Sequence, residues 1–455
     1  MNDDLAQNPI LELLGENDQS RLVEYCTESH PQTIAEYLND QAPELVWKIL
    51  SALPLSSRVE IFSHLNLNEQ VELVSGQTRQ EMARLIEEMA PDDRADLVQR
   101  LAPQVAEDIL PLVARAERED IRRLVSYAED TAGAVMSTDY ATLRAEVGIN
   151  EALSLLRTQA SVKETIYYVY VVDDKHRLIG FISLKDLILA KPTQQVVDVM
   201  HSEVLTINVE EDREEAARKI EKYGLIAIPV VDSSERLLGI ITYDDAMDII
   251  NKEQSEDLLA FGGIGADTEQ DEVPYWQGRV GPVVRRRISW LVMLFMAEGI
   301  TGTVLRHFQW VQRDIPDLSL FVPLLIGTGG NAGSQTVSTI IRALATGDIR
   351  GRDGWKVLGK EFVTGIILGF LLGSLGFIYT NVVRGQSVEF ASVIGFTILA
   401  ICTWANSVGA VIPLVAKRFG IDPAVVSAPL ISTLVDATGL IIYYSIAIAI
   451  LLRLN

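Results

Sequence analysis

The hydrophobic positions of this chain follow three successive patterns. Between Asn8 and Ala128, apolar residues recur at helical spacing, as at Leu97, Leu101 and Val105, in pieces of roughly 10–14 residues. Each piece starts near a proline, whose missing amide hydrogen is tolerated in the first turn of a helix. These prolines are Pro43, Pro54, Pro91 and Pro103. The pattern predicts an all-α N-terminal domain, a superhelical stack of small helices.

A repeat of strand, turn, strand and helix follows, with its two copies offset by 59 residues. Alternating apolar residues lead to the pattern Gly-h-h-Ser/Thr-x-x-Asp, where h is apolar, in both copies. Its hydroxyl and carboxylate residues are Ser183 and Asp186 in the first copy and Thr242 and Asp245 in the second.

The repeat resembles a tandem pair of cystathionine-β-synthase (CBS) domains over about residues 131–250. The resemblance implies α+β domains with a groove that often holds ATP or another adenine nucleotide. It places the same four residues, Ser183, Asp186, Thr242 and Asp245, at that groove. The alternative is that both hydroxyls cap the next helix and both carboxylates stabilise its first turn. Tyr170 stands where the second copy has Pro229, which argues against two equivalent grooves.

One continuous helix is predicted from Tyr243 to Phe261, with carboxylates spaced to form a broad acidic face. They are Asp245, Asp248, Glu253, Glu256 and Asp257. Gly262, Gly263 and Gly265 end this helix, and a linker continues to residue 278.

Five long apolar stretches occupy the last third of the chain. Each is close to or above the ~20 residues that cross ~30 Å of hydrocarbon, so we expect five membrane spans. They are Ile288–Leu305, Leu318–Leu344, Val357–Val383, Phe390–Val415 and Ala424–Leu452.

Basic residues between these stretches are unequally divided between the two sides of the membrane. One side would carry Arg285, Arg286, Arg287, Arg350, Arg352, Lys356, Lys360, Lys417 and Arg418. The other would carry Arg306, Arg313, Arg384 and Arg453. Because cytoplasmic loops are enriched in Lys and Arg, we expect a cytoplasmic N-terminus and a location in the inner (plasma) membrane.

Charge is also unequal along the chain. Residues 1–278 contain 24 Lys and Arg against 53 Asp and Glu, and residues 279–455 contain 15 against 9. The acidic part repels nucleic acid and attracts cations, although solubility alone would also favour it. Cys26 and Cys402 are too few for a disulfide framework, and the first residues do not read as a cleaved signal peptide.

Two carboxylates, Glu298 and Asp436, fall inside apolar stretches, where charged groups are costly and usually functional. The alternative for each is a packing role. The second stretch carries a Gly-rich segment with Asn331, Ser334 and Gln335. Its sequence matches a dinucleotide-binding fingerprint, but we do not expect dinucleotide binding, because no βαβ unit surrounds the segment. A carboxylate with neutral oxygens suits a partly hydrated Mg²⁺, and a two-fold dimer would supply a second carboxylate.

The segments Gly329–Gln335, Arg342–Asp348 and Asp436–Gly439, together with the order of domains, resemble the MgtE magnesium-channel family. This implies a multi-domain homodimer with an acidic helical domain (1–130), tandem CBS domains (131–250), a connecting helix and linker (243–278) and a five-helix transmembrane domain (279–455). It also implies a pore lined mainly by the second and fifth spans, in which Asp436 of both subunits holds hydrated Mg²⁺. Asn331 of the second span is a further candidate pore ligand, because its amide supplies a neutral oxygen.

The resemblance further implies passive Mg²⁺ influx that cytosolic Mg²⁺ shuts off by bridging carboxylates, so that the connecting helix closes the pore. The implied sensor ligands are Asp92, Asp96, Asp245, Asp248, Glu253, Glu256 and Asp257. Two alternatives are a membrane-tethered sensor and an exchanger or carrier for another divalent ion such as Co²⁺. We expect no enzyme, because no Walker, His-Glu-x-x-His or Cys/His motif occurs.

Overall fold

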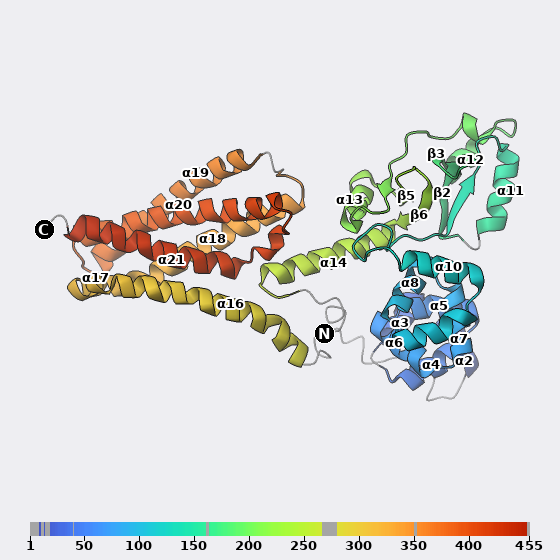
Figure 1. Cartoon of the computed structure of the whole chain (residues 1–455), viewed down its shortest axis with the longest axis horizontal. Coiled ribbons are helices and arrows are strands. Elements are labelled where there is room, and N and C mark those ends of the chain that lie inside the picture. Colours follow the sequence, from blue (N-terminus) through green and yellow to red (C-terminus); the bar gives the residue numbers. More distant parts are fainter. Residues whose placement is uncertain are drawn as a thin grey trace. The chain divides into compact units, whose positions relative to one another are not determined.

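The structure is a computed structural model that describes residues 9–10, 13, 19–39, 41–160, 163–265, 280–349 and 353–452 (Figure 1). It forms two compact units, Met1–Glu253 and Gln254–Asn455. Helix α14 (Tyr243–Phe261) is continuous, as the acidic pattern predicts, and contributes residues to both units. The predicted linker 266–278 and the cations Arg350, Arg352 and Arg453 lie outside the described residues.

The N-terminal part of the first unit is all-α. Its helices are α2 (Gln19–Glu28), α3 (Pro31–Leu38), α4 (Pro43–Ser51), α5 (Leu55–Ser63), α6 (Leu67–Gly76), α7 (Arg79–Glu88), α8 (Pro91–Arg100), α9 (Pro103–Ile109) and α10 (Arg115–Leu124). They have 7 to 10 residues, at or below the lower end of the expected length, and residues with extended backbone, such as His30 before α3 and Leu101 after α8, separate them. Pro43, Pro91 and Pro103 open helices as predicted, whereas Pro54 is the residue before α5.

These helices stack in a regular order. From α3 to α8, each helix packs on the helix two places further along the chain, so α6 contacts α8 and α8 contacts α10. Buried side chains such as Leu50, Phe62 and Ile86 form one continuous core through the stack. This repeated contact is the superhelical arrangement that the periodicity predicts.

Residues after α10 form two three-stranded sheets. The first contains β1 (Tyr140–Leu143), β2 (Thr165–Val172) and β3 (Leu178–Ser183), and the second contains β4 (Ile207–Asn208), β5 (Ala227–Val231) and β6 (Leu237–Thr242). In each sheet the middle strand pairs parallel to the first strand and antiparallel to the third. The helices are α11 (Ile149–Gln159), α12 (Leu184–Leu189) and α13 (Arg213–Tyr223).

The same Asp–Arg hydrogen bonds follow the middle strand of each sheet. Asp173 accepts hydrogen bonds from the backbone and side chain of Arg177, and Asp232 does the same for Arg236. The difference at Tyr170 and Pro229 also has a physical basis. The short strand β4 pairs with Val230 and Val231 only, so the missing amide hydrogen of Pro229 breaks no bond to β4.

The second unit contains five long helices, α16 (Val280–His307), α18 (Val322–Ala345), α19 (Gly354–Ile378), α20 (Val388–Arg418) and α21 (Ala428–Ala447). Short helical turns include α17 (Gln309–Asp314) and η5 (Pro316–Phe321) before α18, and α19 continues through a π-helical turn, η7 (Tyr379–Val383). By length and composition, four segments of the described chain could cross a membrane: Val280–His307, Gly354–Val383, Val388–Arg418 and Ala428–Leu451.

Helix α18 does not reach this apolar composition, so the expected count of five spans is not confirmed. Its residues from Gly327 to Thr336 are mostly Gly, Thr, Asn, Ser and Gln. The small residues allow close packing. A side chain at Gly329 would meet Ile401 of α20 and Val435 of α21, and one at Gly333 would meet Ile431 of α21.

Candidate functional site

Two acidic segments that are distant in sequence lie close together in the first unit. Asp92 and Asp93 occupy the first turn of α8, and Asp244 and Asp245 occupy the first turn of α14. Glu164, the residue before β2, lies near these four carboxylates. Its charge raises the pKa of Asp92, and the charges of Asp245, Asp244 and Asp93 raise the pKa of Glu164. We call these five residues the acidic junction. It joins the helical domain, the first CBS sheet and α14.

Burial and mutual repulsion disfavour charge on the acidic junction. Burial raises the pKa of Asp92 well above its usual range, and the charges of Asp245, Asp93 and Glu164 raise it further. Partial burial, then Asp245, Asp244 and Asp93, raise the pKa of Glu164 to about 7. Burial raises the pKa of Asp245 to about 6 against hydrogen bonds from Thr242. Carboxylates held this way favour a proton or a cation as partner.

One oxygen of the junction is poorly satisfied. Oδ1 of Asp92 is buried and has no hydrogen-bond partner among the described residues. Buried polar atoms in native proteins usually have a hydrogen-bond partner, so this oxygen is open to a water molecule or an ion. Nevertheless, no group of three or more His, Cys, Asp or Glu in the described chain is already arranged to hold a metal ion. The oxygens suit Mg²⁺, but binding would have to draw them together.

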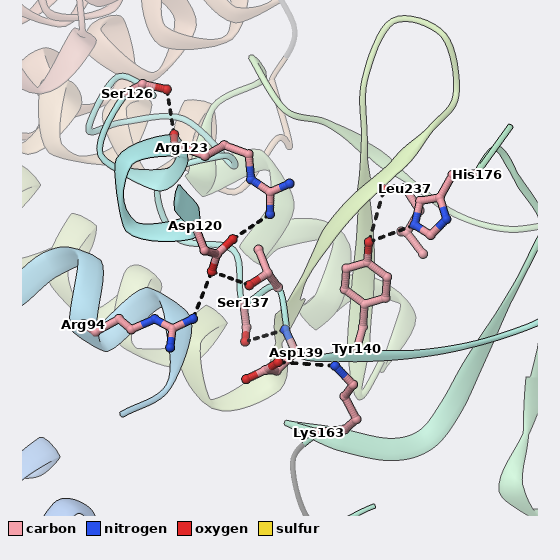
Figure 2. A network of polar contacts seen from close by, with 11 residues as sticks. Arg94, Asp120, Arg123, Ser126, Ser137, Asp139, Tyr140, Lys163, His176 and Leu237 are labelled. Atoms are coloured by element: carbon pink, nitrogen blue, oxygen red, sulfur yellow. Dashed lines mark hydrogen bonds and ion pairs between the residues drawn. The ribbon is translucent and has the colours of Figure 1, made fainter. Parts of the chain in front are cut away.

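A buried ion pair joins α8 to α10 next to the segment that leads into the first CBS sheet (Figure 2). Arg94 Nη2 of α8 donates to Asp120 Oδ2 of α10 across 3.0 Å, and the two side chains are only 8% and 15% exposed. Asp120 also accepts from Arg123 Nη2 at 2.7 Å and from the Thr138 hydroxyl at 2.7 Å. Thr138 lies just before β1, so Asp120 holds three segments together next to Asp92.

The neighbouring residue Ser137 connects this network to the junction. Its hydroxyl donates to Glu164 Oε2 at 3.3 Å, and its backbone pairs with Ile240 of β6. Figure 2 shows Lys163 beside Asp139, which is two residues after Ser137, and its Nζ lies 3.3 Å from Asp139 Oδ1. The stretch from Ser137 to Asp139 therefore sets where the helical domain and the CBS sheets meet.

The predicted sensor residues are only partly brought together. Asp92 and Asp245 meet in the junction, and burial and then Asp244 raise the pKa of the nearby Asp248. Asp96 is exposed on α8, one turn beyond Asp92. Glu256 and Asp257 are half-buried on the part of α14 that belongs to the second unit.

Glu253 has a different environment from the other predicted sensor residues. Its Oε1 accepts from both Nε and Nη2 of Arg213, at 3.1 and 3.0 Å. A guanidinium therefore already neutralises this carboxylate.

The four residues predicted at the nucleotide groove are paired with one another. Ser183 accepts from the Asp186 amide at 3.0 Å as the N-cap of α12, and its hydroxyl donates to Asp186 Oδ2 at 2.6 Å. His201 Nε2 lies 3.2 Å from the same oxygen. In the second copy the Thr242 hydroxyl donates to Asp245 Oδ2. The Ser183 bonds support the capping alternative in the first copy. In either copy a ribose hydroxyl would have to replace or share the bonds to the carboxylate.

In the second unit, the carboxylate of Asp436 lies where α21 crosses α18. A side chain at Gly330 would lie 2.5 Å from Ser432 Oγ and 3.8 Å from Asp436 Oδ1, so the Ser432 hydroxyl would have to move to admit it. Asp436 Oδ1 is buried and without a partner among the described residues. Asn331 follows Gly330 and is exposed. Glu298 of α16 lies within electrostatic range of Asp436.

Several residues of the junction were missed by sequence reasoning. Asp93 and Asp244 adjoin predicted residues, and the acidic pairs Asp92-Asp93 and Asp244-Asp245 were a usable signal. Glu164 had none, and neither had Asp120 beside the junction, because only the packing of distant segments brings them to the site.

Family models match most of the chain. Residues 29–130 match the "MgtE intracellular N domain", residues 132–192 and 196–252 match the "CBS domain", and residues 322–446 match MgtE, "Divalent cation transporter". The chain is 40% identical to magnesium transporter MgtE of Thermus thermophilus over 70% of both chains. It is 34% identical to the transporter of that name from Enterococcus faecalis over 70% of this chain and 69% of the relative.

Two solved structures are similar to about half of this chain. The cytosolic domain of the Mg²⁺ channel MgtE in complex with ATP has a TM-score of 0.51 and 35% identity, and the match covers 53% of this chain and 98% of that one. The soluble part of a magnesium transporter has a TM-score of 0.51 and 30% identity, with 54% and 96% covered.

Proposed function

This chain belongs to the MgtE family of magnesium transporters, and we propose that it is a Mg²⁺-selective channel that admits Mg²⁺ passively across the inner membrane and closes when cytosolic Mg²⁺ binds. The acidic junction is the observation that carries this proposal. Asp92, Glu164 and Asp245 repel one another while they are charged, so the compact arrangement needs a cation or protons. Mg²⁺, which prefers carboxylate oxygens, would supply that charge.

Gating then follows from differential binding. A ligand shifts a conformational equilibrium only by as much as it binds one state better than the other. Mg²⁺ would bind the compact state, in which α8 and the start of α14 lie together, better than a splayed state. Low cytosolic Mg²⁺ would release this contact between α8 and the start of α14, and the resulting movement of α14, the proposed plug, would open the pore.

Conduction is proposed to run along α18 and α21. The unpartnered oxygen of Asp436, the exposed amide of Asn331 and the Gly-rich packing of α18 suit a hydrated cation in a polar path. The same polar residues interrupt the apolar sequence of α18, which therefore lacks the long apolar window of the other four long helices, as expected for a span that lines water. One carboxylate per chain supplies too little negative charge to balance a divalent ion, so we propose a homodimer that brings two copies of Asp436 to the pore.

Orientation and nucleotide binding complete the proposal. We place the helical domain (1–130), the CBS pair (131–250) and the connecting region (243–278) in the cytoplasm, and the pore domain (279–455) in the bilayer. ATP or a related adenine nucleotide would bind the CBS pair, as supported by the ATP complex of the similar cytosolic domain. The proposed contacts with the nucleotide are Ser183, Asp186, Thr242 and Asp245. Binding would break or share the hydrogen bonds that now join Ser183 to Asp186 and Thr242 to Asp245.

Flux through proteoliposomes tests conduction and closure together, with Mg²⁺ varied separately on each side. We expect flux down the Mg²⁺ gradient without a counter-ion, and loss of flux when Mg²⁺ rises on the side that exposes the soluble part. Flux that depends on a second ion would instead identify an exchanger. Equal flux of Co²⁺ would contradict the selectivity, and no flux would favour the tethered sensor.

A further inference from the structure

Arg213 connects three segments of the first unit. It is the first residue of α13, and its backbone amide donates to Asp130 O at 3.0 Å, just where the chain leaves the helical domain. Its guanidinium donates twice to Glu253 Oε1 of α14 and lies 3.5 Å from Asp130 Oδ1. The interdomain segment, the second CBS domain and the connecting helix therefore meet at one side chain.

This guanidinium is nearly inaccessible to water. The Arg213 side chain is 8% exposed, whereas those of Glu253 and Asp130 are 28% and 82% exposed. A cation at the N-terminus of a helix opposes the helix dipole, so its position does not serve α13 itself. A buried charge persists only where a partner compensates it, and Glu253 is the best placed partner.

Glu253 also shares a face of α14 with the residues that pack on the CBS pair. Ala246, Ile249 and Glu253 follow helical spacing, and the first two are buried in one core with Ala216 and Ile220 of α13. The carboxylates Asp244 and Asp245 of the same helix instead face other carboxylates.

We propose that Arg213 is a resident cation that anchors α14 to the CBS pair through Glu253 without Mg²⁺, so that Glu253 is a positioning residue and not an ion ligand. This inference rests on the proposed gating. It assigns two separate attachments to α14: the acidic junction at its start depends on Mg²⁺, and the Arg213–Glu253 pair does not. When Mg²⁺ leaves, α14 stays attached to the second CBS domain, and movement of that domain is transmitted along the helix.

Exchanging the charges of Arg213 and Glu253 distinguishes an anchoring role of Glu253 from a role as an ion ligand. Closure by Mg²⁺ is measured in proteoliposomes for Glu253→Gln, for Arg213→Glu with Glu253→Arg, and for Arg213→Met with Glu253→Met. We expect the single variant to raise the Mg²⁺ concentration at half closure by about tenfold and both double variants to return it to within about twofold of the unmodified protein. Glu221→Gln, an exposed carboxylate of α13, is the matched control. Double variants that need as much Mg²⁺ as Glu253→Gln overturn the proposal.

Amide hydrogen exchange of the full chain in chelator tests the anchor without any flux. We expect the amides of Ile249 to Glu253 to stay protected when Mg²⁺ is removed and to lose protection in Glu253→Gln. Loss of protection in the unmodified protein on Mg²⁺ removal overturns the anchor even if the channel closes normally. Retained protection in a protein that conducts no Mg²⁺ contradicts the proposed function and leaves the anchor supported.

Discussion

The hydroxyl of Thr138 donates to Asp120 Oδ2 across 2.7 Å and so bonds the helical domain to the segment that leads into the first CBS sheet. The same oxygen accepts from Arg94, two residues after Asp92. The position of the acidic junction therefore depends on a buried ion pair that is not itself part of the junction.

Removal of the Asp120 charge should destabilise the chain. Asp120→Asn leaves the guanidinium of Arg94 buried without its counter-charge, which costs about 3 kcal/mol of unfolding free energy. Thermal unfolding of the detergent-solubilised chain measures the effect. Asp108→Asn is the matched control, because Asp108 is 64% exposed and pairs with Arg79 at 3.6 Å, so its loss should cost less than about 1 kcal/mol. Equal effects of the two variants would contradict the role given to Asp120.

Replacement of Asp436 tests the pore. Asp436→Ala should abolish Mg²⁺ flux, because the proposed path loses its carboxylate, while the chain still folds. Proteoliposome flux measures the loss and size-exclusion chromatography checks the assembly. Glu389→Gln, in the first turn of α20, removes a carboxylate from the same unit and should leave flux unchanged. Wild-type flux through Asp436→Ala would show that the permeating ion does not need this residue.

The acidic junction should set the Mg²⁺ concentration that closes the channel. Asp92→Asn combined with Asp245→Asn removes two of the carboxylates that Mg²⁺ would bridge. We expect closure to need at least about tenfold more Mg²⁺, since each lost ligand weakens binding of the compact state. Closure is measured by flux at graded Mg²⁺. Asp174→Asn, which changes a fully exposed carboxylate of the first CBS domain, is the control. An unchanged Mg²⁺ dependence would exclude the junction as the sensor.

The raised pKa values predict that the compact first unit loses stability as the pH rises in Mg²⁺-free buffer. The folded pKa of Asp245 is about 6 and that of Glu164 about 7, both above their unfolded values. Folding therefore binds protons, so this stabilisation is complete below about pH 4 and is lost as the pH rises through 6 to 7. We expect a decrease on the order of 1–2 kcal/mol between pH 5 and 7.5, after allowance for solvent screening.

Thermal unfolding in chelator at the two pH values measures this decrease, and saturating Mg²⁺ should reduce it because the ion replaces the protons. Glu164→Gln should also reduce it. The pKa values of Asp173, Asp186 and Asp232 are lowered, so these carboxylates stay ionised between pH 5 and 7.5 and do not contribute to the change in stability. A first unit that becomes more stable from pH 5 to 7.5 in chelator would contradict the prediction.

Close packing of α19 on α20 predicts a strong effect of one added methyl group. A side chain at Gly373 would lie 2.5 Å from the carbonyl oxygen of Gly395, so the two helices would have to separate. Gly373→Ala should lower the stability of the second unit by about 1–3 kcal/mol. A smaller fraction of the chain should then stay monodisperse in detergent after heating. At Gly359 of the same helix an added side chain meets no atom within 4 Å, so Gly359→Ala is the control. Equal retention by the two variants would contradict the packing.

The sequence alone determined the elements and their class. Helical periodicity with prolines at helix starts predicted the stack, because both signals act within one turn of chain. The 59-residue repeat predicted two matching strand and helix units, and apolar length predicted the long helices of the second unit. The acidic face of α14 was readable for the same reason, since its carboxylates are near neighbours in sequence.

Tertiary structure alone decided which charges meet. Glu253 and Arg213 are separated by 40 positions along the chain, and Asp120 and Arg94 by 26, and no local pattern relates the members of either pair. Five similar carboxylates on one predicted helix therefore have different surroundings: Asp245 faces other carboxylates, whereas Glu253 faces a guanidinium. Periodicity fixes the face of a helix on which a side chain lies, but only the packing of distant segments fixes the charge opposite it.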